Sequence, residues 1–153
     1  MKRSTATLLA ALVVAVIVWL PLDARHDGQA SAASCHGRVE HVVLSRSKYP
    51  HIVDHVEDSW ALGYPRVLRV HRAGATERRA RLLGWWQRKH PQPKGDGLDL
   101  DEAPAAMLRV SWRADVRPIA AAENRSAGAS LGGQLRGVPD GTCVDYRFTG
   151  RAT

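Results

Sequence analysis

Several common signatures of catalytic and binding sites are missing from this sequence. No cysteines and histidines have the spacing of a zinc site, and the chain has only two cysteines. It contains neither a Gly-Lys-Ser/Thr loop for nucleoside phosphates nor a serine nucleophile elbow. Residues 33–153 also show no internal repeat and no low-complexity block. These absences argue against a zinc module, a P-loop enzyme, an α/β-hydrolase and a repeat protein.

The N-terminal segment, residues 1–32, has the order of charge and hydropathy that is typical of a secretory signal peptide. Two basic residues precede an almost unbroken apolar run from Thr7 to Leu20, and Ala30-Ser31-Ala32 fits a cleavage site. A retained membrane anchor is the alternative, although the run is shorter than the roughly 20 residues of a spanning helix. We therefore expect a secreted domain over residues 33–153, with no stable membrane partner once the segment is removed.

The two cysteines, Cys35 and Cys143, stand near opposite ends of this domain. In an oxidising compartment such a pair is predicted to form a disulfide, and two unrelated buried thiols are the alternative. A domain of this size has a limited core, so a covalent link between distant segments would stabilise it.

Apolar periodicity predicts interleaved strands and helices. Strand-like alternation covers residues 39–45, 67–71, 107–112 and 143–148. Helical spacing covers a segment from Pro50 to Gly63 and another from Thr76, its expected N-cap, to about Trp86. Residues 126–135 form either a short helix or a structured loop, and the stretch from 113 through 118 is expected to be irregular. Because the order has no regular βαβ spacing, we expect a compact α+β domain.

The charge of the chain indicates the sign of its partners. There are 22 Lys and Arg against 15 Asp and Glu, a net charge of +7, which favours polyanions such as nucleic acid, acidic lipid or wall polymer. Within this basic chain, Asp99, Asp101 and Glu102 form the densest acidic cluster of the domain. A divalent cation could bridge such carboxylates to a phosphate and help to activate water. The alternative is a solvated acidic loop.

A second group of polar residues is Glu123-Asn124-Arg125-Ser126, followed by small residues up to Gly133. The carbonyl oxygen of an asparagine can bind a hard metal ion, and an arginine can pair with a phosphate in bidentate fashion. An ordinary capped loop is the alternative interpretation, because Asn and Ser are common there.

Taken in order, these pieces resemble the NucA/NucB-type deoxyribonuclease family over nearly the whole region from about Val42 to Phe148. The resemblance is carried by Lys48-Tyr49-Pro50, Pro65-Arg66-Val67-Leu68, Arg72-Ala73-Gly74-Ala75, Gly97 to Met107, Glu123 to Gly128, Gly132-Gly133-Gln134-Leu135 and Asp140-Gly141-Thr142. No single piece is specific, but their order and spacing together are. This chain departs from the family pattern at Ala103, where an aromatic is usual, at Ser126 and at Gly133.

The resemblance implies a reduced ββα-metal nuclease with a mixed or antiparallel sheet. In that interpretation Asp101 is the general base, in place of the more usual histidine, and Glu102 assists or orients it. Candidates for the shell of a Mg²⁺ or Mn²⁺ ion are Asn124 and Gln134. Phosphates would be held by Arg78, Arg79 and Arg125.

The resulting hypothesis is a secreted, metal-dependent and largely sequence-nonspecific DNA endonuclease. Nonspecific cutting is expected because the arginines are directed at phosphates rather than at bases. The alternative is a basic module that binds extracellular DNA without cutting it. We expect a monomer, with a protein inhibitor as a further conceivable partner.

Overall fold

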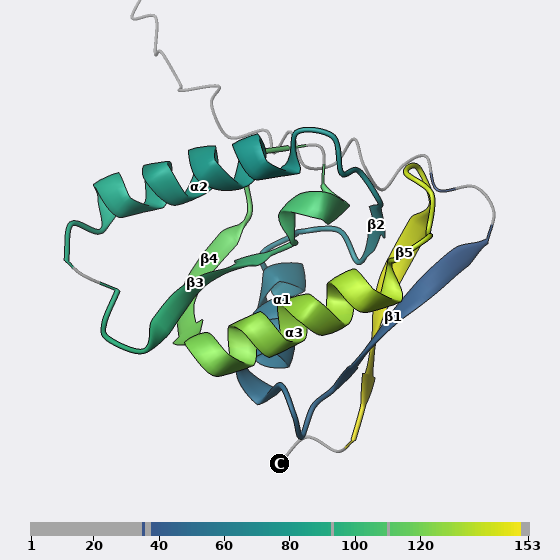
Figure 1. Ribbon diagram of the computed structural model, residues 1–153, viewed down its shortest axis with the longest axis horizontal. Helices are drawn as coiled ribbons and strands as arrows, with labels where there is room; N and C mark the ends of the chain where they lie inside the picture. The colour runs from purple at the N-terminus through teal and green to yellow at the C-terminus, as the bar shows by residue number, and fades with distance from the viewer. Residues whose placement is uncertain (1–34, 36–37, 93, 110, 151–153) are drawn as a thin grey trace, which may run out of the picture.

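The computed structural model describes Cys35 and residues 38–92, 94–109 and 111–150, along which strands and helices alternate (Figure 1). The strands are β1 (Val39–Ser45), β2 (Val67–Arg69), β3 (Leu98–Ala103), β4 (Asp115–Ala120) and β5 (Cys143–Thr149). The helices are α1 (Pro50–Ala61), α2 (Ala75–Lys89) and α3 (Ala121–Gln134), and a short 3-10 helix, η2, covers Ala106–Leu108. The expected α+β class is confirmed.

The segment 1–32, interpreted above as a signal peptide, lies outside the described residues. Among the residues that are described, no helix is long and apolar enough to cross a membrane.

The first and last strands lie side by side in a three-stranded sheet. β1 pairs with β5 in parallel, from Val39 opposite Cys143 to Ser45 opposite Thr149, and β2 pairs with β5 antiparallel on its other edge. Cys35, shortly before β1, forms a disulfide with Cys143 at the start of β5. The predicted disulfide is confirmed, and it joins the two strands where their pairing begins.

A second, antiparallel pair of strands, β3 and β4, runs directly into α3 and forms a ββα unit with it. Successive side chains of a strand point to opposite faces, so β3 presents two sets of residues. Asp99 and Asp101 contact α3 and α1, whereas Leu100 and Glu102 contact α2. The pair is therefore covered by α1 and α3 on one face and by α2 on the other (Figure 1).

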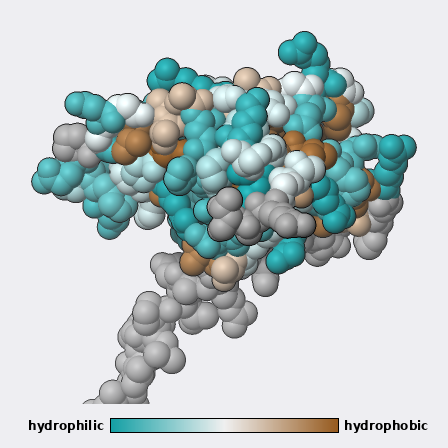
Figure 2. Space-filling view, turned by 90° about the horizontal axis from the view of Figure 1, so that it is seen from below, coloured by the Kyte–Doolittle hydropathy of each residue, from teal (hydrophilic) through white to brown (hydrophobic). Residues whose placement is uncertain are grey.

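The two faces of this strand pair have separate cores. On one side, the stripe of α1 packs with β1, β5 and α3 in a cluster that includes Val53, Leu44 and Leu131. On the other side, Leu82 of α2 packs against Leu100 of β3 and a neighbour on β4. Each fully buried aliphatic side chain contributes on the order of 1.5–3 kcal/mol. Figure 2 shows a mostly hydrophilic face with small, separate apolar patches, as is normal for a folded domain.

The helix boundaries partly match the sequence. α1 starts at Pro50, whose missing N–H costs nothing in the first turn, and it ends before Gly63, which has a φ of 91°. The expectation of Thr76 as N-cap is wrong, because α2 follows Gly74 at φ 66° and continues to Lys89. α3 is a helix rather than a loop, and it begins five residues earlier than expected, at Ala121.

The predicted strand over residues 107–112 is wrong, and the segment expected to be irregular holds β4 instead. Arg109 explains the error, because its buried guanidinium donates to the carbonyls of Pro104 and Ser111 and so closes the segment on itself. β4 accommodates Pro118 because, among the described residues, β3 is its only sheet partner, so one side of β4 requires no backbone donor. The expected strand 67–71 is shorter, ending at Arg69.

Candidate active site

A cavity of about 100 Å³ brings together residues from α2, β3 and α3. Its polar lining consists of Arg79, Asp101, Glu102 and Asn124, with the phenol of Tyr146, and apolar residues of β1, α1 and α3 form the rest. The cavity is therefore lined by both proposed catalytic residues, Asp101 and Glu102. Asn124, a proposed metal ligand, and Arg79, a proposed phosphate contact, line it too. Few polar groups converging in a mostly apolar pocket are typical of ligand and active sites.

Asp101 is held by a histidine that lies far away in the sequence. Its Oδ2 lies 2.6 Å from Nδ1 of His55, on α1, and its side chain is only 16% exposed. The second oxygen, Oδ1, accepts no hydrogen bond from any residue in the described part of the chain. The carboxylate is thus fixed at one oxygen and open at the other.

His55 is completely buried and has carboxylates at both ends of its ring. Nε2 lies 3.2 Å from Oδ2 of Asp115, on β4, at ion-pair distance but without hydrogen-bond geometry. The His55 imidazole therefore contacts one carboxylate on each strand of the β3–β4 pair. Sequence reasoning did not identify His55. The available signal was a polar ring on the apolar face of α1, between Ile52 and Val56.

Glu102 points to the other face and is paired with two arginines. Its Oε1 lies 2.6 Å from NH1 of Arg79, and its Oε2 accepts from NH2 of Arg109. Glu102 and Arg109 are both almost fully buried. Burial lowers the pKa of the Arg109 guanidinium, and the charge of Glu102 offsets part of that shift. Glu102 therefore fixes Arg79 at the edge of the cavity.

Asn124 lies in the first half of α3, half-buried, and its side-chain amide has no hydrogen-bond partner among the described residues. Carboxylate and amide oxygens are the ligands that hard divalent cations prefer, and Mg²⁺ keeps several waters when one or two protein groups bind it. No three His, Cys, Asp or Glu side chains in the described ranges are placed to hold a metal by themselves. The free amide of Asn124, facing the same cavity as Asp101, fits an ion that is held mainly through water.

Glu123, the residue before Asn124, fixes the relative position of α1 and α3. Its Oε1 accepts from the backbone N–H groups of His51 and Ile52, at 2.9 and 3.1 Å, and its Oε2 lies 2.8 Å from Nδ1 of His51. α1 has no side-chain cap of its own, so Glu123 satisfies its first turn from another helix. The position of His55 relative to Asn124 depends on this contact.

The remaining residues of the sequence hypothesis lie outside the cavity. The amide of Gln134 bonds both the N–H and the carbonyl of Val43, and so satisfies the outer edge of β1. Arg78 donates to the carbonyls of His71, Ala73 and Ala106. Arg125 is 75% exposed, and its Nε lies 2.7 Å from Asp99.

Tyr146 is the contribution of β5 to the cavity. Burial, together with the negative charges of Asp101 and Glu102, raises the pKa of its phenol well above the ordinary value. The group therefore stays protonated at neutral pH and faces the two carboxylates as a neutral donor.

A two-stranded hairpin followed by a helix, with an aspartate on its first strand and an asparagine on its helix, defines a reduced ββα-type domain. The chain is 35% identical over 106 residues to the protein named DNA-entry nuclease from Bacillus subtilis (strain 168). The aligned region covers 69% of this chain and 68% of that protein. No protein-family model matches the chain. It belongs to the NucA/NucB-type, or DNA-entry nuclease, family.

Proposed function

We propose that this protein is an endonuclease that hydrolyses DNA phosphodiester bonds with the help of a divalent metal ion. The observation that carries the proposal is the shared cavity, in which Asp101, Asn124 and Arg79 face one small space. The name of the relative, DNA-entry nuclease, supports DNA as the substrate. Since the arginine available to the substrate would contact phosphate, we expect cutting with little preference for sequence.

In the proposed reaction, Asp101 is the general base. Its free oxygen accepts a proton from the attacking water as the water oxygen bonds to phosphorus, and the bond from phosphorus to the leaving sugar oxygen breaks, that oxygen taking a proton from solvent. His55 holds the other oxygen of Asp101 and keeps the carboxylate aimed at the cavity. Arg79, anchored by Glu102, binds a non-bridging oxygen of the phosphate and offsets the charge that develops there. A bound Mg²⁺ or Mn²⁺ would supply Lewis-acid stabilisation of the phosphate and activation of water. Asn124 would hold it.

We also propose that the protein acts outside the cytoplasm. The disulfide between Cys35 and Cys143 supports this, because such bonds form and persist in oxidising compartments. The apolar segment that precedes the domain in the sequence agrees with export.

The test is plasmid nicking by the purified protein with Mg²⁺ or Mn²⁺, with chelator, and with the variant Asp101→Asn. We expect metal-dependent nicking that falls by roughly 10²- to 10⁴-fold in Asp101→Asn, the range for loss of a general base. The matched control is Asp96→Asn, which makes the same chemical change at an exposed residue of the β3 approach and should cut normally. Binding of DNA without cutting under every metal condition would overturn the enzyme and leave a DNA-binding module.

A further inference from the structure

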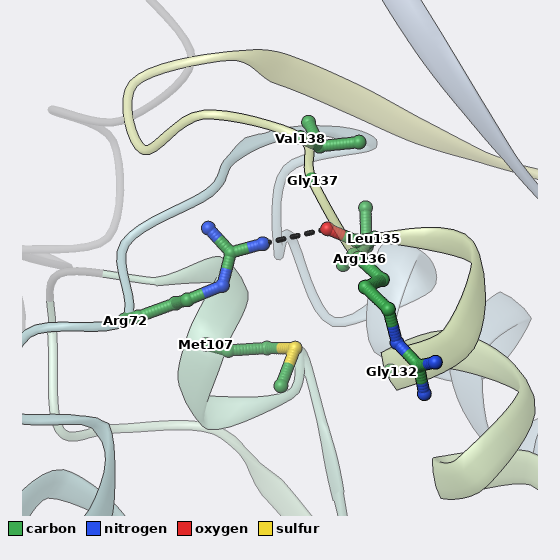
Figure 3. Close-up of a pocket in the computed structure, with 7 residues that line it drawn as sticks. All are labelled: Arg72, Met107, Gly132, Leu135, Arg136, Gly137 and Val138. Atoms are coloured by element: carbon green, nitrogen blue, oxygen red, sulfur yellow. Dashed lines mark hydrogen bonds between the residues drawn. The ribbon is translucent and has the colours of Figure 1, made fainter.

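A second hollow, of about 450 Å³, lies at the C-terminal end of α3 (Figure 3). Figure 3 shows Arg72 and Met107 on one side of it, and Gly132, Leu135 and Arg136, from the end of α3 and just after it, on the other. Its lining contains two guanidinium groups and no carboxylate. None of these residues lines the active-site cavity, and the reaction proposed above uses none of them.

The hollow and the active-site cavity lie in line along α3. The cavity is lined by Asn124 and Gly128, and the hollow by Gly132, at helical spacing on one helix. The opposite wall also continues, from Ala105 at the cavity to Met107 at the hollow. A Cβ atom added at Gly128 or Gly132 would meet nothing within 4 Å, so no side chain stands between the two spaces at these positions.

The charges of the hollow favour an anion. Arg136 has no ion-pair or hydrogen-bond partner for its side chain within the described ranges, and it is exposed. Arg72 pairs with Asp140 at 2.5 Å and donates to the carbonyl of Leu135 at 2.7 Å. The pKa of Asp140 is lowered by the hydrogen bonds from Arg72, so the two charges of that pair cancel at neutral pH. Arg72 also occupies the carbonyl of Leu135, just after α3, and no carboxylate lies beside Arg136 among the residues that line the hollow.

We infer that this hollow binds a backbone phosphate of the same nucleic acid strand that occupies the active-site cavity. The inference rests on the proposed function and adds a second contact point to it. Asn124 and Gly132 are about 12 Å apart along the helix, from a rise of 1.5 Å per residue. Because this separation is several times the roughly 3.4 Å axial rise per nucleotide of a B-form strand, the contacted phosphate would lie a few nucleotides away from the cleaved bond.

The test measures binding and cleavage separately, with Arg136→Ala and the matched control Arg88→Ala. Arg88 is exposed on α2 and has no described ion-pair partner, so its removal subtracts the same charge from another part of the surface. Binding of a fluorescein-labelled duplex of about 20 base pairs, roughly two helical turns, is followed by anisotropy in chelator, where no cutting is expected. Cleavage of the same duplex is then followed with Mn²⁺.

We expect Arg136→Ala to weaken binding on the order of tenfold, since a charge-assisted contact is lost. The slope of log K against log salt should fall in magnitude by about 0.9, which is one phosphate contact. In cleavage, the loss should fall mainly on KM rather than on kcat. Arg88→Ala should match the wild-type protein in all three quantities.

Equal behaviour of Arg136→Ala and the wild-type protein in binding would overturn the inference. So would an equal loss in Arg88→Ala, because it would show a diffuse effect of net charge. A wild-type protein that binds but never cuts would refute the proposed nuclease instead. In that case the anisotropy comparison in chelator still decides whether the hollow binds phosphate.

Discussion

Replacing Glu102 by glutamine should destabilise the fold strongly, because it leaves Arg109 as a buried cation without a counter-charge. Both side chains are 4% exposed, and the guanidinium would keep only neutral acceptors, among them the carbonyls of Pro104 and Ser111. Breaking a buried ion pair from one side typically costs about 3–5 kcal/mol. Glu102 is also paired with Arg79, but Arg79 is 46% exposed, so loss of this ion pair should add no more than about 1 kcal/mol to the destabilisation.

The measurement is equilibrium unfolding in urea. With an m-value of roughly 2 kcal/mol per molar, a loss of this size moves the midpoint down by about 2 M. Glu77→Gln, an exposed change on α2 with no ion pair among the described residues, should move it by less than about 0.25 M.

A double-mutant cycle with Arg109→Met separates the pair from the packing around it. If the cost of Glu102→Gln is the unpaired cation, the double variant Glu102→Gln/Arg109→Met should be more stable than the sum of the single losses by at least about 2 kcal/mol. Additive losses, or a Glu102→Gln midpoint equal to that of the Glu77→Gln control, would refute the reasoning.

Three further predictions concern the disulfide, the active site and the phenol of Tyr49. Replacing Cys35 and Cys143 by serine should cost about 2–5 kcal/mol in the same urea assay, because the bond closes a loop with a sequence separation of 108; a loss under about 1 kcal/mol would contradict this. His55→Gln should lower the nicking rate by roughly 10- to 100-fold while the protein stays folded by circular dichroism, as for other residues that orient a reacting group; an unchanged rate would exclude its positioning role. Hydrogen bonding from Lys48 and Ser126 lowers the pKa of Tyr49, so absorbance at 295 nm should rise with pH earlier in the wild-type protein than in Tyr49→Phe. Identical curves would show that another group titrates first.

The parts of the fold that were predictable are those fixed by local pattern. The strands 39–45 and 143–149 and the start of α1 at Pro50 follow from alternation and from the preference of proline for a first turn. The predicted strand over residues 107–112 is wrong although Leu108 is apolar and fully buried, as a strand residue would be. The side-chain hydrogen bonds of its neighbour Arg109 hold the segment in another conformation. Periodicity reports burial, and it does not report which groups satisfy the backbone.

The candidate active site was likewise predictable only in part. The resemblance brought Asp101, Glu102 and Asn124 forward as a group, and the structure places all three at one cavity. The resemblance gave no reason to choose His55, because the residue that His55 contacts, Asp101, lies 46 positions away in the sequence. The resemblance also suggested Gln134 as a metal ligand, but its amide bonds the backbone of Val43 at the outer edge of β1, and that edge exists only once the sheet has formed.

The pairing of β1 with β5 also sets when this protein can acquire its site. β5 is the central strand of its sheet, the sheet partner of both β1 and β2, and it is synthesised after them. A chain that leaves the ribosome, or passes a membrane, N-terminus first holds β1 and β2 without the strand that joins them, and non-local pairings of this kind form late. Tyr146 arrives only with β5, so the cavity is incomplete until then. The active-site cavity of the proposed nuclease can therefore form only after β5 has been made and has paired with β1 and β2.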